Sequence, residues 1–241
     1  MCEGPLRGSR RAERARTSNG GYRRVSPIAP RPREGPLIEP TADARPGPRE
    51  RVLMPHTCRS QLDKIGRKAQ DTAELFFEEV RVPADNLLGG VEGQGFYQLM
   101  ADLPYERMMI GVGALAAMEG AYRATLDHVR ERQAFGRPLA DFQNTRFKLA
   151  EVATQITVGR AFIDRCVEQL LAGALDAATV SMAKLWASET EGRVIDELLQ
   201  LHRGYGYMNE FLIARMYADA RIARIYGGTN EIMKELIARA L

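Results

Sequence analysis

The 241-residue chain has few of the residues that build metal sites and disulfides. Its three cysteines, Cys2, Cys58 and Cys166, share no short spacing. An odd and scattered set argues against a disulfide framework or a zinc site, and it is typical of a reducing compartment. The three histidines are equally dispersed, so the sequence predicts no metal site.

The chain also lacks a long apolar run. The longest, residues 108–118, is too short to cross a bilayer. The N-terminus has no apolar segment that could act as a signal peptide. We therefore expect a soluble, cytoplasmic protein with no membrane partner.

Lysine is absent before Lys64, and the two parts of the chain differ in composition. Residues 1–60 hold thirteen arginines, six acidic residues and nine of the 12 prolines, whereas the remainder is net acidic. This composition predicts a disordered tail over residues 1–58. A basic tail can bind nucleic acid, but the single aromatic residue and the interspersed acids make a plain tail the better interpretation. The composition is also typical of out-of-frame translation of GC-rich DNA.

Order is expected to begin near Leu62. Residues 73–82 are rich in aromatic and β-branched side chains and end at Pro83, which predicts a strand pair or one long strand. A turn is expected over residues 83–86, and Gly89 and Gly90 act as a breaker. We interpret residues 59–91 as a short β segment.

Residues 92–241 are predicted to be helical, which makes the fold mainly α. Apolar positions at spacings of three, four and seven favour long helices over 96–129, 142–171 and 177–201. The apolar run 108–118 is expected to be largely buried. Shorter helices follow over 211–225 and from residue 230. Short loops between long helices predict an up-and-down four-helix bundle. Trp186, the single tryptophan, is interpreted as a packing or interface residue.

Four separated motifs give the sequence a family resemblance. They are D-K-I-G-R-K-A-Q-D-T-A-E-L-F-F-E-E-V-R-V-P, R-E-R-Q-A-F-G-R-P-L, Q-L-H-R-G-Y-G-Y-M-N-E and I-Y-G-G-T-N-E-I-M-K-E-L-I-A-R. In order and spacing they resemble the acyl-CoA dehydrogenase family over residues 60–241. The matched part is the end of that family's middle β domain and its C-terminal four-helix domain.

The resemblance implies FAD-dependent dehydrogenation at the α and β carbons of an acyl-CoA thioester. One carboxylate removes the α-proton while a hydride leaves the β carbon for the flavin. The resemblance also implies a homo-oligomer, a tetramer or a dimer, with an electron-transfer flavoprotein as acceptor. The alternative from a different class is a non-catalytic, truncated bundle that oligomerises but binds FAD poorly.

The catalytic base is assigned by its place in the motifs. Many family members carry it in the final turn as Y-E-G-T, where this chain has Gly227 followed by Gly228. In the long-chain-like and isovaleryl-like branches it lies on the first long helix before an arginine, and Glu106 falls there, in L-P-Y-E-R. Burial against the apolar run that follows would favour the protonated form of a carboxylate. Tyr105, Arg107 and the two glycines are expected to contact substrate. On the residues alone, Glu106 and Arg107 are ordinary first-turn helix residues.

The cofactor contacts implied by the resemblance come from three motifs, and an arginine fork suits a diphosphate. Without the resemblance, Thr229 and Glu231 would be a helix cap and Arg132 a helix-end cation. Arg203 stands where the family's Q-x-x-G-G has its first glycine, and it either adds a phosphate contact or obstructs the site. The residues expected to contact FAD, partly across a subunit interface, are Arg132, Gln133, Phe135, Gln143, Gln200, Gly204, Thr229 and Glu231.

Overall fold

The computed structural model describes residues 15–16, 22–23, 60–70, 72–74 and 81–241. The chain divides into two units, Met1–Arg51 and Val52–Leu241. In the first unit, β1 (Ala15–Arg16) pairs antiparallel with β2 (Tyr22–Arg23). The rest of the tail predicted to be disordered, residues 1–58, lies outside the described residues.

The second unit begins with a small β segment. Strand β3 (Ser60–Gln61) pairs antiparallel with β4 (Ala73–Glu74), with Ser60 opposite Glu74. The strand expected over 73–82 is confirmed at its first two residues; residues 75–80 lie outside the described part, and 81–82 are not in a strand. The turn expected over 83–86 contains a short 3-10 helix, η1 (Ala84–Asn86).

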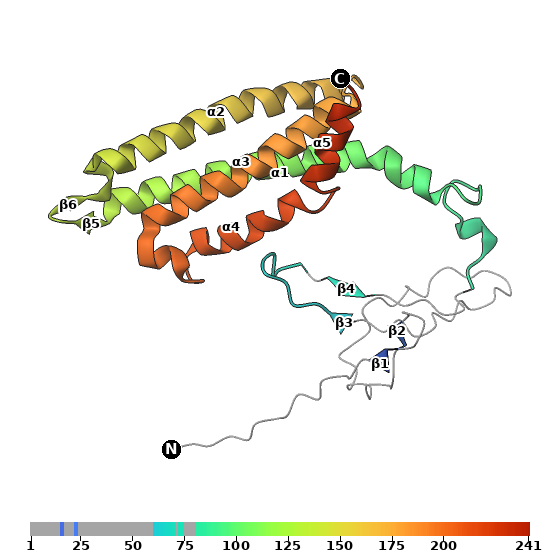
Figure 1. Cartoon of the computed structure of the whole chain (residues 1–241), viewed down its shortest axis with the longest axis horizontal. Coiled ribbons are helices and arrows are strands. Elements are labelled where there is room, and N and C mark those ends of the chain that lie inside the picture. Colours follow the sequence, from blue (N-terminus) through green and yellow to red (C-terminus); the bar gives the residue numbers. More distant parts are fainter. Residues whose placement is uncertain (1–14, 17–21, 24–59, 71, 75–80) are drawn as a thin grey trace, which may run out of the picture. The chain divides into compact units, whose positions relative to one another are not determined.

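A helical bundle forms the rest of this unit, as predicted. Its α-helices are α1 (Gly95–Glu131), α2 (Gln143–Leu171), α3 (Ala177–His202), α4 (Leu212–Ala220) and α5 (Asn230–Ala238). The three long helices run side by side, with α4 along α3 and α5 at one end (Figure 1). Helix α3 packs against all four of the others.

Shorter elements connect the helices. The connections are β5 (Gln133–Ala134), β6 (Arg137–Pro138), η2 (Leu139–Asp141), η3 (Arg203–Tyr207) and η4 (Arg221–Arg224). Strands β5 and β6 pair as a hairpin between α1 and α2. The helix expected over 211–225 is divided, since α4 ends at Ala220 and η4 completes the segment.

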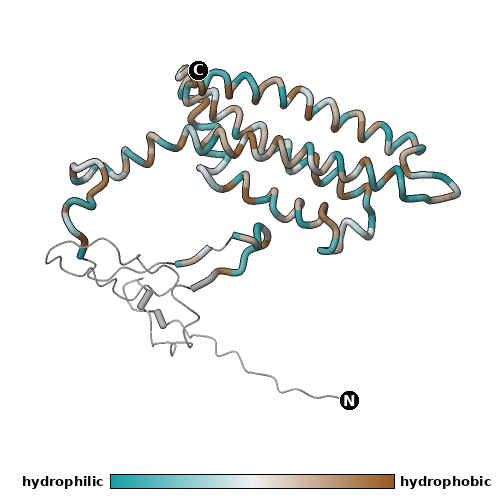
Figure 2. The backbone as a smooth tube through the Cα atoms, turned by 180° about the vertical axis from the view of Figure 1, so that it is seen from behind, coloured by the Kyte–Doolittle hydropathy of each residue, from teal (hydrophilic) through white to brown (hydrophobic). Residues whose placement is uncertain are grey.

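The apolar stripes that predicted the helices face the core. Hydrophobic and hydrophilic residues alternate along each helix (Figure 2). Leu149, Val152 and Ile163 of α2 are buried, as is the expected stripe of α3. Residues 108–118 are mostly buried or half-buried, as expected. Met108 and Met118 are buried, but Met109 is exposed because α1 packs against the bundle along one side only.

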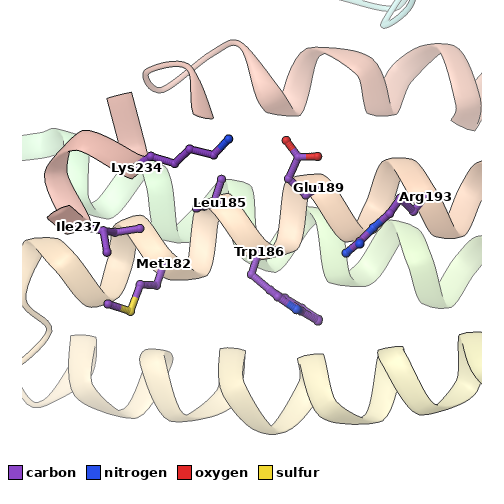
Figure 3. A pocket seen from close by; sticks show the side chains of 7 residues that line it. All are labelled: Met182, Leu185, Trp186, Glu189, Arg193, Lys234 and Ile237. Carbon is purple, nitrogen blue, oxygen red and sulfur yellow. The ribbon is translucent and has the colours of Figure 1, made fainter. Parts of the chain in front are cut away.

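The packing role predicted for Trp186 is confirmed. Its ring lies directly on Gly159 of α2, where a Cβ atom would collide with it, and meets Phe162 edge to face at 6.4 Å. It also lines an open groove of about 460 Å³ along α3, between α5 and α2 (Figure 3). Lys234 lines the α5 side of this groove and Met182 the α3 side.

Candidate active site

The Gly227–Gly228 turn requires glycine both for its backbone conformation and for space. The φ angles are +65° at Gly227 and +93° at Gly228, a region that side chains with a Cβ rarely adopt. A Cβ on Gly227 would lie 2.5 Å from Cδ1 of Ile110, and one on Gly228 would lie 3.0 Å from Cε of Met233. Gly227 therefore lies against α1 and Gly228 against α5, and a side chain at either position would displace a neighbouring side chain.

Arg107 ties this turn to α1. Its Nε donates a hydrogen bond to the carbonyl oxygen of Gly227 at 3.1 Å, across 120 residues of sequence. The side chain is 7% exposed, and burial lowers the pKa of Arg107 while the charge of Glu106 opposes that shift. The α1 turn that carries Glu106 is thus fixed beside the glycine turn, so the sequence prediction joins two segments that the fold does bring together.

The burial expected for Glu106 is wrong for this chain. Glu106 and its neighbour Tyr105 are exposed, and Tyr105 is 58% accessible. Met108, two residues after Glu106, is buried in the core, whereas Glu106 itself is on an exposed side of the helix. Phe96, Leu99 and Met109 are exposed on the same helix. Burial of Glu106 would need a further layer over α1.

The sequence interpretation missed Lys184, which anchors the other half of the turn. Lys184 has no exposed surface; its Nζ donates to the carbonyl oxygen of Gly228 at 2.8 Å and to Oδ1 of Asn230 at 2.7 Å. Burial, reinforced by the charge of Arg107, lowers the pKa of Lys184 to about 8. The available signal was a cation inside the apolar stripe of α3, between Ala183 and Ala187.

Thr229 and Glu231 start helix α5 directly after the turn. Thr229 is the N-cap residue, although its side chain bonds to none of the first backbone N–H groups. Instead, the backbone N–H of Glu231 and the Thr229 hydroxyl both lower the pKa of the Glu231 carboxyl. These two expected cofactor residues therefore lie beside the glycine turn.

The other expected cofactor residues lie at the opposite end of the bundle, where β5 and β6 are drawn in Figure 1. The Arg132 guanidinium lies 5.3 Å from the ring centroid of Tyr205, next to Gly204. Phe135 is 87% exposed. Gln133, Gln143 and Gln200 are exposed in the same region.

This distal group has features that suit an anion. Arg132 and Arg137 are in no ion pair within the described part of the chain. A Cβ on Gly204 would meet nothing within 4 Å. Arginines that lack carboxylate partners can bind a diphosphate, and the free space beside Gly204 lets a ligand approach the backbone. Arg132 follows Arg107 by 25 residues of helix, about 37 Å, so the two groups do not form one compact site within a chain.

Arg203 has a backbone conformation that glycine adopts readily. Its φ is +53° and its ψ is −132°, and it ends α3 with its N–H bonded to the carbonyl oxygen of Gln200. This conformation is costly for any residue with a Cβ. The Arg203 side chain is exposed, so within the chain it does not fill the space over Gly204.

The bundle and its two residue groups define a helical domain of a known class. Residues 93–241 match the family model described as acyl-CoA dehydrogenase, C-terminal domain. The chain therefore belongs to the acyl-CoA dehydrogenase family. Among the described residues, no helix is long and apolar enough to cross a membrane.

Relatives in this family agree with that assignment. The chain is 54% identical over 181 residues to the long-chain specific acyl-CoA dehydrogenase, mitochondrial, of Rattus norvegicus, covering 75% of this chain and 42% of the relative. It resembles the crystal structure of an acyl-CoA dehydrogenase from Geobacillus kaustophilus, with 49% identity, a TM-score of 0.75 and coverage of 78% and 50%. The acyl-CoA dehydrogenase complexed with FAD from Bacillus anthracis gives 31% identity, a TM-score of 0.70 and coverage of 76% and 35%. The chain thus spans about half or less of the length of these relatives.

The rat protein is mitochondrial by name, so the cytoplasmic location expected here stays a prediction.

Proposed function

We propose that this chain takes part in FAD-dependent α,β-dehydrogenation of an acyl-CoA thioester, with Glu106 as the base that removes the α-proton. The bond from Arg107 to Gly227 carries the proposal, because it fixes the helix turn of Glu106 beside a backbone free of side chains. FAD, when bound, accepts the hydride.

The glycine turn also offers hydrogen-bond donors. The N–H groups of Gly227 and Gly228 donate to no acceptor among the described residues. Both lie beside Arg107, whose charge favours electron density on a nearby carbonyl oxygen. Fixed donors of this kind stabilise the negative charge that develops on a thioester oxygen as the α-proton leaves. Tyr105, exposed next to Glu106, lies where it can contact the acyl group.

Cofactor binding is assigned to both ends of the bundle. Thr229 and Glu231 would meet the flavin side. The distal residues Arg132, Gln133, Phe135, Gln143, Gln200 and Gly204 would hold the diphosphate and adenosine side. Their separation of about 37 Å favours a cofactor shared between two chains, so we also propose a homo-oligomer, a tetramer or a dimer. An electron-transfer flavoprotein is the proposed acceptor.

One observation favours the alternative, a non-catalytic bundle that oligomerises but binds FAD poorly. Glu106 is exposed, and a general base of this kind works best in a dry site. The colour of the purified full chain separates the two functions. After incubation with FAD and gel filtration, flavin absorbance near one per chain supports the dehydrogenase. A colourless, helical oligomer supports the alternative.

A further inference from the structure

Lys184 is a buried cation that the proposed chemistry does not use. It has no exposed surface and lies in no ion pair within the described part of the chain. Its Nζ hydrogen bonds go to two neutral oxygens, the carbonyl of Gly228 and the side-chain amide of Asn230. Burying an ammonium group without a bonded carboxylate is expensive, and an apolar residue would pack there at lower cost. The position therefore calls for an explanation other than stability.

Asn230 is held so that its oxygen faces Lys184. The residue is 2% exposed, and its Nδ2 donates to Oε1 of Glu189 at 2.8 Å and lies 3.0 Å from Oγ of Ser188. With the amide nitrogen engaged on α3, Oδ1 accepts from Lys184 at 2.7 Å and from the hydroxyl of Ser188 at 3.2 Å. Lys184 therefore bonds to both the turn and the first residue of α5.

Two cations from different helices hold consecutive carbonyl groups of the turn. Arg107 of α1 binds the oxygen of Gly227, and Lys184 of α3 binds the oxygen of Gly228. A trans peptide group is planar, and its N–H points opposite to its C=O. Because each carbonyl is drawn into the bundle, the N–H of Gly228 and that of Thr229 point away from it. Neither N–H has an acceptor among the described residues.

We propose that Lys184 is a positioning residue that orients the Gly228–Thr229 peptide, so that its N–H group faces a hydrogen-bond acceptor of the bound ligand. This inference rests on the proposed function for the identity of the ligand. The acceptor is an oxygen or nitrogen of either the flavin or the acyl thioester. Lys184 touches neither ligand and acts through the turn.

The variant Lys184→Met tests this in the full chain, because methionine fills a similar volume and donates no hydrogen bond. Lys184→Gln retains a neutral donor, and Lys148→Met is the matched control, since Lys148 pairs with Glu197 on the bundle surface. Hydrogen–deuterium exchange of the ligand-free chain should rise about tenfold in Lys184→Met at Tyr226 and Met233, whose bonded amides flank the turn, which corresponds to the loss of about one hydrogen bond. Peptides within α1, α2 and α3 should change less than twofold. Lys184→Gln should give an intermediate rise, and Lys148→Met should give none.

Two exchange results would overturn the role of Lys184. Unchanged exchange at Tyr226 and Met233 would show that the lysine does not hold the turn. Equal increases throughout the bundle would show that it only stabilises the fold. Titration with FAD alone and with an acyl-CoA then identifies the acceptor, since only the ligand that meets the turn should bind more weakly to Lys184→Met. If the unaltered chain binds neither ligand, the proposed function fails, while the exchange result still decides whether Lys184 orients the turn.

Discussion

The Nε atom of Arg107 lies 3.1 Å from the carbonyl oxygen of Gly227, which joins the first bundle helix to the last turn of the chain. Glu106, the proposed base, is the preceding residue on α1, and the family resemblance implies that many members carry their base in this turn. We propose that a base on α1 acts at the same place as a base in the turn. Glycine suits position 227 because a Cβ atom there would lie 2.5 Å from Cδ1 of Ile110.

The close approach at the turn is tested by Gly227→Ala. Alanine has to adopt the +65° φ and its Cβ meets Cδ1 of Ile110, so the free energy of unfolding should fall by about 1–2 kcal/mol. Ile110→Val removes that Cδ1 atom, and the double variant should recover part of the loss but not the backbone cost. Urea unfolding measures all three variants. If Gly227→Ala is as stable as the unaltered chain, the turn does not need glycine.

The glycine-like backbone of Arg203 predicts a stabilising substitution. Arg203→Gly should raise the free energy of unfolding by about 1 kcal/mol or more, because glycine adopts φ +53° and ψ −132° without strain. Arg203→Ala keeps the Cβ and should give no such gain. Thermal unfolding of the two variants makes the comparison, and equal midpoints would show that the arginine is unstrained.

Two buried groups give the bundle opposing pH dependences. Glu191 is 4% exposed, and burial raises its pKa to about 7 against the opposing charges of Arg67 and Arg224; Asp219 adds to the shift. Between about pH 4.5 and 7 the Glu191 carboxyl is protonated in the folded chain but ionised in the unfolded chain. The contribution of Glu191 to the free energy of unfolding therefore falls as pH rises through that window.

His202 acts in the other direction. It is 6% exposed, and burial together with His128, stacked on it at 4.1 Å, lowers the pKa of His202 to about 4. Its contribution to stability is lost as pH falls from about 6.5 to 4. Between pH 4.5 and 6.5 the two groups offset each other.

Glu191→Gln separates these two effects. The variant keeps the shape of the side chain but removes the titration, so its stability should rise more steeply from pH 5 to pH 7 than that of the unaltered chain. The change in the free energy of unfolding between pH 5 and pH 7 should differ between the two chains by about 2 kcal/mol. Urea unfolding at pH 5, 6 and 7 measures it, with the half-exposed Glu197→Gln as control. Parallel profiles would show that Glu191 is ionised throughout.

The sequence predicted the helices well because their apolar stripes are long and glycine ends them. Gly173 and the Gly204 region bound α3 to within one residue of the prediction. It could not place Lys184 or Glu191, because a charged residue beside an apolar stripe is normally assigned to the solvent face. The sequence also could not predict that Glu106 is exposed, because its burial depends on what packs over α1. The domain limits of 59–91 and 92–241 stay predictions.

The most direct test of the account is substrate-induced bleaching of bound flavin in Glu106→Gln. The unaltered chain, loaded with FAD and mixed anaerobically with an acyl-CoA, should lose the absorbance of its oxidised flavin as hydride reaches the cofactor. Glu106→Gln should bind as much FAD but bleach at least about a hundredfold more slowly, because a general base contributes at least that factor. Glu119→Gln, on the same helix and paired with Arg160, should behave like the unaltered chain. Bleaching at the normal rate in Glu106→Gln would contradict the assignment of the base.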